Sequence, residues 1–334
     1  MTLKVGINGF GRIGRMILRS IVESKRKDLE VVAINNRGGA EISSFLLKYD
    51  TIHGKLEAKI DHSEKSIEIN GKKINMIHEE EIAKIDWKKH EVDVVLECTG
   101  KFNSKEKSEQ HIKSGARKVL VSAPCKGAKN IVFGVNQKTL KSDDQGISAA
   151  SCTTNCLAPV AKVINDNFGV ERGFMTTIHS YTNDQRLLDN SHKDLRRARS
   201  APNSIIPTTT GATKSLGDVI PDLKGRVEGI SIRVPTQNVS LVEFVFSSKK
   251  NLSEKEINNA FLKASKGELK NILDTSNELL VSSDFNHNSY SSVVDLTLTK
   301  VSEGKMAKVS AWYDNEWGFA NRMCDLSVYL GNIK

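Results

Sequence analysis

Near its N-terminus the chain reads Leu3-Lys4-Val5-Gly6-Ile7-Asn8-Gly9-Phe10-Gly11-Arg12-Ile13-Gly14. An apolar run of the kind found in buried strands comes first, and apolar residues then recur at helical spacing through residues 12–24. Between the two, Gly9, Gly11 and Gly14 form the pattern G-x-G-x-x-G. Glycines so placed allow a tight turn and a close approach of the backbone to a pyrophosphate, which a helix N-terminus also attracts. Because a strand precedes the pattern and a helix follows it, we expect a dinucleotide site rather than an ordinary turn.

The first 150 residues continue to alternate between strand and helix patterns. Apolar runs typical of strands occupy residues 30–35, 92–98 and 118–122. A helical stretch at residues 104–114 separates the last two. This alternation predicts an α/β Rossmann domain, that is, a doubly wound parallel sheet. Residues 55–77 alternate instead like an antiparallel hairpin, with Asn70-Gly71 as its turn.

The pattern changes after residue 152. Longer strands are expected at residues 173–179, 226–235, 239–247, 291–299 and 308–313. Residues 158–167 can continue a helix, and further helices are expected at residues 253–267, with Ser253 and Glu256 as a capping box, and at residues 317–330. These elements predict an α+β domain with a largely antiparallel sheet.

Composition excludes several classes of protein. The 334 residues include 49 basic and 40 acidic side chains, which give a net charge of +9. No apolar run approaches the roughly 18 residues that span a bilayer, and the N-terminus lacks a signal-peptide pattern, so we expect a soluble, cytoplasmic protein. Five scattered cysteines fit a reducing compartment, and no second ligand pair accompanies Cys152 and Cys156, so no metal site is expected. Basic and acidic residues are interleaved, which favours a solvated surface over a nucleic-acid site.

The loop after the second expected strand bears on the choice of dinucleotide. The fingerprint normally has an acidic residue about 20 positions after the last glycine, where it holds the ribose hydroxyls. Here that position is Asn36, and Arg37 follows it. A neutral amide does not repel a 2′-phosphate, and an arginine can pair with one, although Arg37 is equally open to interpretation as a solvated loop cation. The sequence therefore admits NADP.

A second motif is Ser151-Cys152-Thr153-Thr154-Asn155-Cys156, which precedes an apolar helical run. It places Cys152 near a helix N-terminus, where the helix dipole favours the thiolate and lowers the pKa of the thiol. A histidine is the natural partner of such a nucleophile, and His179 ends an expected strand where polar residues replace the apolar pattern. From these residues alone, two ordinary buried side chains remain the favoured alternative.

Five blocks occurring in order remove that alternative. They are residues 9–14, 149–156, 179–182, 208–212 and 312–318. With these blocks the chain resembles phosphorylating glyceraldehyde-3-phosphate dehydrogenase (type I) over essentially its whole length. The resemblance implies a dinucleotide-binding domain of residues 1–151 plus the C-terminal helix 316–334, and a catalytic domain of residues 152–315. It also implies a homotetramer in which residues 180–204 form a loop between subunits.

The family's reaction, part of glycolysis and gluconeogenesis, assigns roles to the two candidate catalytic residues. Cys152 would attack the aldehyde of glyceraldehyde 3-phosphate. His179 would activate the thiol and take up the hydroxyl proton as hydride leaves for the nicotinamide. The Cys152 N–H and the His179 ring would stabilise the developing oxyanion. Inorganic phosphate would then cleave the thioester to yield 1,3-bisphosphoglycerate.

The resemblance also implies binding residues. Thr182 and Arg233 would bind the phosphate of the substrate. The residues expected around the attacking phosphate are Ser151, Thr153, Arg199, Thr210 and Gly211. Asn315 would hold the nicotinamide carboxamide. The rest of the cofactor would be lined, besides the glycines, by Arg12, Ile13, Thr99 and Ser122.

Two positions depart from the pattern of NAD-using members of the family. Those members carry Asn-Asp where this chain has Asn35-Asn36, and Leu-Pro where it has Asn190-Ser191. Photosynthetic NADP-using relatives resemble this chain in having serine at the last of these positions. A serine hydroxyl can donate to a 2′-phosphate, whereas proline cannot. Together with Asn36 and Arg37, Ser191 predicts that the cofactor is NAD or NADP, with NADP used well.

Three alternatives stay open at this point. Erythrose-4-phosphate dehydrogenase applies the same cysteine and histidine chemistry to a longer aldehyde, but its members tend to differ around Ser180-Tyr181-Thr182, where this chain keeps the glyceraldehyde-3-phosphate pattern. A thiol hydrolase or acyltransferase would have no use for a dinucleotide site. RNA binding through the net positive charge is possible as a second role, but nucleic acid is not required.

Overall fold

The computed structural model describes residues 2–333 and divides into two compact units. Unit 1 contains the residues up to Ile131, Asn136–Ala150 and the residues from Ala320 onward. Unit 2 contains Val132–Val135 and Ser151–Phe319. The functional domains expected from the sequence, with boundaries after residues 151 and 315, stay a prediction.

Unit 1 is built on one sheet with the strand order β10-β11-β9-β8-β1-β2-β7-β6-β5. Neighbouring strands are parallel from β10 to β7, and β6 is antiparallel to both β7 and β5. The strands are β1 (Leu3–Asn8), β2 (Leu29–Asn35), β5 (Ile60–Ser63), β6 (Ser66–Ile69), β7 (Lys72–Ile77), β8 (Val94–Glu97), β9 (Lys118–Val121), β10 (Lys129–Asn130) and β11 (Gly146–Ser148). Strands β3 (Tyr49–Asp50) and β4 (Gly54–Lys55) pair separately. The predicted Rossmann sheet is confirmed.

The hairpin expected at residues 55–77 is only partly correct. Asn70 and Gly71 join β6 and β7 with φ of 51° and 82°, the left-handed values of the expected turn. However, β7 also pairs in parallel with β2. The hairpin therefore extends the main sheet, because the backbone groups of β2 need a partner on that edge.

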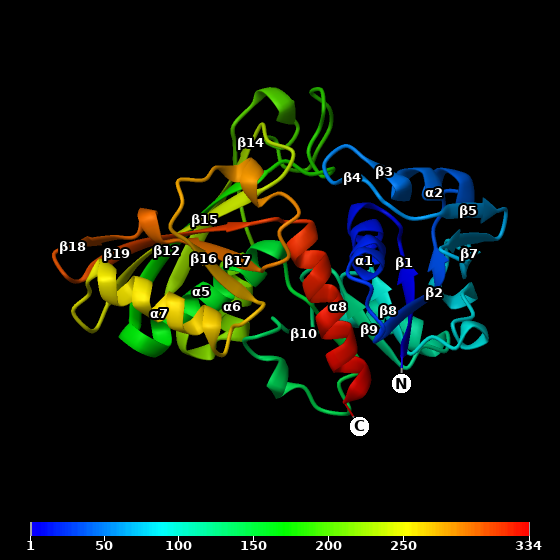
Figure 1. Ribbon diagram of the computed structural model, residues 1–334, viewed down its shortest axis with the longest axis horizontal. Coiled ribbons are helices and arrows are strands. Elements are labelled where there is room, and N and C mark those ends of the chain that lie inside the picture. Colours follow the sequence, from blue (N-terminus) through cyan, green and yellow to red (C-terminus); the bar gives the residue numbers. More distant parts are fainter. Residues whose placement is uncertain (1, 334) are drawn as a thin grey trace. The chain divides into compact units, whose positions relative to one another are not determined.

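The helices of unit 1 are α1 (Arg12–Glu23), α2 (Ala40–Lys48), α3 (Lys105–Ser108), α4 (Gln110–Lys113) and the later part of α8 (Trp317–Asn332). Helix α1 follows β1 as predicted (Figure 1). The helical stretch expected at residues 104–114 is present as two short helices, α3 and α4, which are separated at Glu109. Lys118 on β9 donates from Nζ to the carbonyl oxygens of Leu330 and Ile333, so a buried cation caps the C-terminus of α8.

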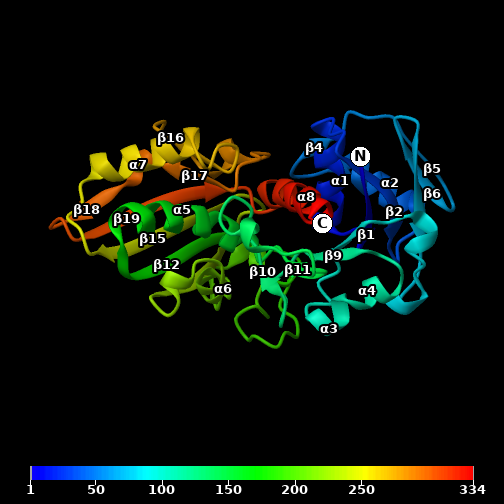
Figure 2. The same ribbon diagram turned by 90° about the horizontal axis from the view of Figure 1, so that it is seen from below.

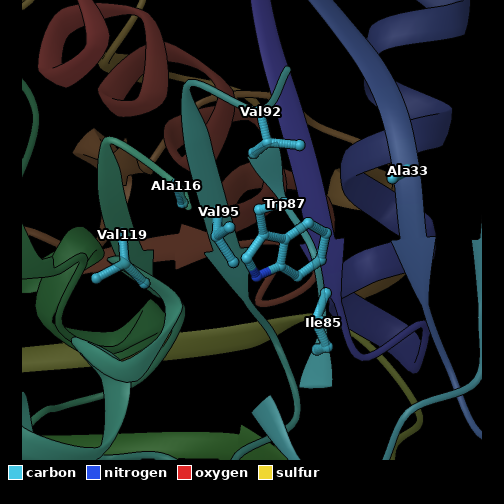
Figure 3. Close-up of a cluster of buried hydrophobic side chains, with 7 residues drawn as sticks. All are labelled: Ala33, Ile85, Trp87, Val92, Val95, Ala116 and Val119. Atoms are coloured by element: carbon cyan, nitrogen blue, oxygen red, sulfur yellow. The ribbon is translucent and has the colours of Figure 1, made fainter. Parts of the chain in front are cut away.

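A cluster of small and branched apolar side chains surrounds Trp87 on one face of this sheet (Figure 3). Its members are Ala33, Ile85, Trp87, Val92, Val95, Ala116 and Val119. The indole needs a strand without a side chain beneath it, since a Cβ on Gly6 would come within 2.6 Å of the ring. The Trp87 Nε1 donates to His111 Nδ1 at 3.0 Å, so the one polar atom of this ring is also satisfied.

Unit 2 is built on a second sheet with the order β13-β14-β12-β15-β19-β17-β16, and β18 pairs with β19. The pairs β12–β14 and β16–β17 are parallel and the others antiparallel, so the largely antiparallel sheet is confirmed. The strands are β12 (Val170–Ser180), β13 (Ile206–Thr208), β14 (Val227–Val234), β15 (Ser240–Ser248), β16 (Leu273–Ser276), β17 (Ser292–Asp295), β18 (Lys300–Ser302) and β19 (Met306–Tyr313). The strand expected at 291–299 is shorter, because Asp295 caps a tight turn at Thr297.

Three helices lie together on one side of this sheet: α5 (Cys152–Phe168), α6 (Ala212–Val219) and α7 (Glu254–Lys266) (Figure 1). Helix α5 lies between the other two (Figure 2). Ser253 caps α7 as expected, accepting from the Glu256 N–H and donating to its carboxylate. Alternate residues of β15 are buried under these helices.

No helix within residues 2–333 has the length and apolar character to cross a membrane. In the same range, no three His, Cys, Asp or Glu side chains gather as a metal site would require.

Candidate active site

The turn between β1 and α1 has the geometry expected for a pyrophosphate. Gly9 has φ of 93°, and a Cβ on it would lie 2.8 Å from Thr99 atoms. A Cβ on Gly14 would lie 2.3 Å from the Gly9 carbonyl oxygen, so α1 packs tightly on the turn. Gly11, the N-cap of α1, faces open space and brings no side chain to cap the helix. These residues therefore fit a dinucleotide phosphate at the helix N-terminus.

Beside this turn, unit 1 has a cavity of about 300 Å³. It is lined by Gly9, Gly11, Asn36, Arg37 and Thr99, and also by Glu79 and Glu80, which sequence reasoning missed. The Arg37 guanidinium lies 3.4 Å from the Glu80 carboxylate, and both side chains are exposed. Asn36 donates to Ser43 Oγ at 3.2 Å. Of the two cations that line this cavity, Arg37 and Lys101, Arg37 is thus already paired with a carboxylate.

The other predicted cofactor residues of unit 1 already form hydrogen bonds or ion pairs within the chain. Thr99 donates both its N–H and its hydroxyl to the buried Glu97 carboxylate, so neither hydrogen is available to a ligand. Ser122 follows β9 and donates its N–H to the Glu97 carbonyl. Arg12 is half-buried and pairs with Asp50. The pKa of Asp50 is lowered to about 2. Burial alone would raise this pKa, but the Arg12 guanidinium and two backbone N–H groups together outweigh the effect of burial.

Cys152 is the first residue of α5 and is partly exposed. Ser151 caps the helix by accepting from the Thr154 N–H at 3.0 Å, which confirms the expected helix start. The expected lowering of the thiol pKa is wrong. Burial among the surrounding side chains raises the pKa of Cys152, and the positive charge of Arg233 and nearby N–H groups offset only part of this effect.

His179, on β12, faces this thiol with Nε2 3.5 Å from Cys152 Sγ. The other ring nitrogen, Nδ1, lies 2.6 Å from the Ser180 carbonyl oxygen. Nδ1 also lies 3.1 Å from the Arg233 guanidinium, which only donates, but the shorter contact is with a carbonyl oxygen, which only accepts. The shorter contact places the hydrogen of the neutral imidazole on Nδ1, and Nε2 then presents a lone pair to the thiol. Burial and the charge of Arg233 lower the pKa of His179 to about 3, so the ring is neutral at neutral pH. The geometry is that of a base beside a nucleophile.

Arg233 lies beside His179 because β12 and β14 are parallel and these two residues are register partners. Its guanidinium donates to the Ser180 carbonyl oxygen at 3.1 Å. Its Nε is buried and has no hydrogen-bond partner within residues 2–333. A buried, unsatisfied guanidinium nitrogen next to the nucleophile indicates a place for an anion.

The other predicted anion-binding residues lie at the ends of strands and helices. Thr210 Oγ1 and Gly211 cap the start of α6, and Thr182 donates its N–H to Gln185. Thr153 is buried, and its hydroxyl contacts the Tyr313 hydroxyl at 2.9 Å. Sequence reasoning missed the role of Tyr313, whose hydroxyl also contacts Thr177 Oγ1 at 2.8 Å. The sequence offered no sign of it, because these residues are far apart along the chain.

Two side chains of the arginine run at residues 196–199 have different surroundings. Arg199 is exposed and pairs with Asp189 at 2.7 Å. Arg197 is half-buried, donates to Thr208 Oγ1 at 2.9 Å and pairs with Asp184 and Asp194. Burial is the main cause that lowers the pKa of His179 and of Arg233, and the charge of Arg197 adds a smaller effect in the same direction. Arg197 is therefore the arginine of this run whose charge acts at the candidate site.

Two more of the predicted cofactor residues, Asn315 and Ser191, lie in unit 2. Asn315 is buried just after β19, and its amide oxygen accepts from the hydroxyls of Ser180 and Ser240. Ser191 lies in the exposed loop after β12, where its carbonyl oxygen accepts from Arg186 at 2.8 Å. The two serines around Asn315 were not among the predicted site residues.

Known proteins are similar to this chain over its whole length. A sequence model described as "Glyceraldehyde 3-phosphate dehydrogenase, NAD binding domain" matches residues 3–105, and one described as "Glyceraldehyde 3-phosphate dehydrogenase, C-terminal domain" matches residues 151–315. The chain belongs to the glyceraldehyde-3-phosphate dehydrogenase family. A protein named glyceraldehyde-3-phosphate dehydrogenase from Cereibacter sphaeroides is 52% identical over 334 residues, which is 100% of both chains. One of the same name from Geobacillus stearothermophilus is 49% identical over 336 residues, which is 99% of each. Family membership confirms the resemblance seen in the five sequence blocks.

Proposed function

We propose that Cys152 and His179 catalyse the phosphorylating oxidation of glyceraldehyde 3-phosphate. As a member of this family, the chain is an oxidoreductase that acts on glyceraldehyde 3-phosphate with a nicotinamide cofactor. The observation that carries the assignment of residues is the 3.5 Å contact between Cys152 Sγ and the unprotonated Nε2 of His179. The test is a spectrophotometric assay with aldehyde, inorganic phosphate and either cofactor. Faster turnover of erythrose 4-phosphate would favour the alternative substrate, and no change in nicotinamide absorbance would refute both.

The reaction can be followed through this chain's own atoms. Cys152 Sγ attacks the aldehyde carbon while His179 Nε2 takes the thiol proton. His179 then passes this proton to the oxyanion, which becomes the hydroxyl of a hemithioacetal. His179 then removes that hydroxyl proton as the carbon loses hydride, which leaves a thioester on Cys152. A phosphate oxygen attacks the thioester carbon, the carbon–sulfur bond breaks, and the cysteine thiolate recovers a proton from His179. Products are the acyl phosphate and the resting thiol.

A nicotinamide dinucleotide supplies one piece of chemistry, the acceptance of the hydride. The turn at Gly9, Gly11 and Gly14 would hold its pyrophosphate, and Asn315 would hold the nicotinamide carboxamide. The Cys152 backbone N–H, at the start of α5, would donate to the developing oxyanion, where a preorganised donor lowers the barrier most.

Two phosphate groups have to be bound in this reaction. Arg233 and Thr182 would bind the phosphate of the aldehyde, and the unpaired buried Nε of Arg233 supports this assignment. Ser151, Thr210 and Gly211 would surround the attacking phosphate. For the arginine of that second group, Arg197 is better supported than Arg199, because its charge acts on His179 whereas Arg199 is exposed.

Replacing Arg233 with glutamine should raise KM for glyceraldehyde 3-phosphate about 100-fold, since a hydrogen bond to a charged group contributes up to about 3 kcal/mol. It should also raise the pKa of both Cys152 and His179, because the guanidinium lowers both. Alkylation of the thiol by iodoacetamide should therefore begin at higher pH than in the wild type. Unphosphorylated glyceraldehyde is the control substrate, and an equal loss with both aldehydes would contradict the phosphate assignment.

We further propose that NADP is accepted alongside NAD. Asn36 lacks the charge that repels a 2′-phosphate, and Arg37 can pair with that group. Ser191 would be an additional donor in the homotetramer that the family resemblance implies. Glu80 opposes this preference because it already pairs with Arg37 and lines the same cavity. The Glu80 carboxylate would also repel a 2′-phosphate and so weaken the binding of NADP. This effect was not predicted from the sequence.

The ratio of kcat/KM for NAD to that for NADP measures this preference and should stay below about 100 in the wild type, a differential of roughly 3 kcal/mol. Asn36→Asp should raise the ratio at least about 10-fold through charge repulsion. Glu80→Gln should lower it by about 2- to 5-fold, the scale of an exposed ion pair. Glu81→Gln is the matched control, because Glu81 pairs with Lys84 and does not line the cavity. An unchanged ratio in Asn36→Asp would mean that this account of the ribose site is wrong.

A homotetramer is also proposed from the exposed apolar side chains. On and after α2 these are Ile42, Phe45, Leu46 and Tyr49, and in the loop before β13 they are Leu187, Leu188, Leu195 and Ile205. Groups of exposed apolar side chains such as these are typical of association surfaces.

The five free cysteines fit a reducing compartment, which supports the proposal of a cytoplasmic location.

A further inference from the structure

The amide of Asn315 is held in one orientation by two serines. Its Oδ1 accepts hydrogen bonds from Ser180 Oγ and from Ser240 Oγ, each at 2.9 Å. All three side chains are buried. Ser180 ends β12 and Ser240 begins the neighbouring strand β15, while Asn315 follows β19, so three strands contribute to one small polar cluster.

The assignment of oxygen and nitrogen in this amide follows from the hydroxyl hydrogens. Ser240 Oγ already accepts from the Ser180 N–H at 3.1 Å and donates to Oδ1. If the amide were turned over, its NH₂ group would donate to both serines, and neither hydroxyl hydrogen would have an acceptor among residues 2–333. Buried donors without acceptors are costly, so Oδ1 faces the serines. Nδ2 therefore points away from them, and no hydrogen bond from it is formed within the described part of the chain.

We propose that Ser180 and Ser240 are positioning residues for the nicotinamide. By holding Oδ1 of Asn315, they leave Nδ2 to donate to the carbonyl oxygen of the carboxamide, which determines the ring face turned toward the substrate. The proposal rests on the proposed function, in which Asn315 binds this group. The same Ser180 accepts the Nδ1–H of His179 through its backbone oxygen. One residue thus orients both the catalytic base and the amide that holds the cofactor.

The experiment measures binding of three ligands by calorimetry. They are NAD, ADP-ribose, which lacks the nicotinamide, and the 3-acetylpyridine analogue of NAD, which keeps the carbonyl oxygen but has no amide hydrogens. Since Nδ2 donates to that oxygen, the wild type should bind NAD and the analogue within about 3-fold of each other. An analogue bound more than about 10-fold more weakly would overturn the proposal, because Asn315 would then be accepting from the carboxamide.

Variants test the serines directly. Asn315→Asp keeps the shape and the acceptor but removes the donor, so NAD should bind at least about 10-fold more weakly while ADP-ribose binds as before. The double variant Ser180→Ala with Ser240→Ala should weaken NAD about 5- to 10-fold, again without affecting ADP-ribose. Ser310→Ala is the matched control, since Ser310 is buried on β19 and its hydroxyl has no partner within residues 2–333. Equal weakening of NAD and ADP-ribose, or NAD binding unchanged in the double variant, would overturn the proposal.

A stereochemical measurement separates positioning from a purely structural role. With a deuterated aldehyde, the wild type should place deuterium on one face of the reduced nicotinamide, and the double variant should place it on both. Retention of a single face in the double variant would contradict the proposal. If the wild type does not oxidise the aldehyde at all, the proposed function fails, whereas the three binding measurements still report on the serines.

Discussion

Serine in place of Cys152 is expected to lower kcat for the phosphorylating oxidation by at least about 10⁴-fold. A hydroxyl attacks an aldehyde carbon less readily than sulfur, and the ester it would form is a poorer acyl donor to phosphate than a thioester. Sγ of Cys152 is the atom that His179 Nε2 faces at 3.5 Å. Steady-state kinetics with saturating aldehyde, phosphate and cofactor give the measurement.

Cys156→Ser is the matched control for this result. Cys156 lies one helical turn further along α5, is buried, and directs its sulfur at the Ala311 carbonyl oxygen at 3.8 Å. Its replacement should change kcat by less than about 3-fold, because it has no path to the substrate carbon. If the two serine variants lost activity equally, or if Cys152→Ser kept more than about 1% of kcat, the assignment of the nucleophile would be wrong.

Asparagine in place of His179 is expected to lower kcat by about 10²- to 10⁴-fold at neutral pH, the usual contribution of a general base. Burial raises the pKa of Cys152, so at neutral pH the thiol needs a base to take its proton during attack. As pH rises toward the thiol pKa, thiolate forms without help, and the deficit of the variant should shrink. The pKa of His179, lowered to about 3, keeps the wild-type imidazole in its basic form down to acidic pH.

The pH profile distinguishes this role from a structural one. A deficit that is the same at every pH would contradict the role of His179 as a base. Alkylation of Cys152 by iodoacetamide should still occur in the variant, with its rate increasing with pH, because the nucleophile remains at the start of α5. Binding of ADP-ribose should be unaffected, since its expected site is in unit 1.

Features encoded by neighbouring residues could be predicted from the sequence. The strand, glycine turn and helix at residues 3–23 form as expected because each of these elements depends on residues within a few positions of one another. The start of α5 is another case, since Ser151 caps it through a bond to Thr154, three residues later. Cys152 and His179 were predicted in the same way, from short motifs that the family shares.

Features that depend on pairing between distant segments could not be predicted from the sequence. The parallel pairing of β7 with β2 joins residues some 40 positions apart. The hydrophobic pattern of either strand does not indicate which strand it pairs with. Ser240 became part of the candidate site only because β15 begins beside the end of β12. Likewise, Arg233 is adjacent to His179 through strand register and not through any local motif.

The pKa values of the site residues could be determined only from the folded structure. A helix N-terminus is visible in the sequence and predicted a low thiol pKa, but the loss of water around Cys152 depends on every segment packed near it and changes the sign. Arg197 and Arg199 look alike in sequence, and only the folded loop shows which charge acts on His179. Local residue order therefore determines the turn, the helix start and the chemical identity of the nucleophile. Three-dimensional packing determines solvation, charge and side-chain orientation, because these properties sum over residues that are neighbours only after folding.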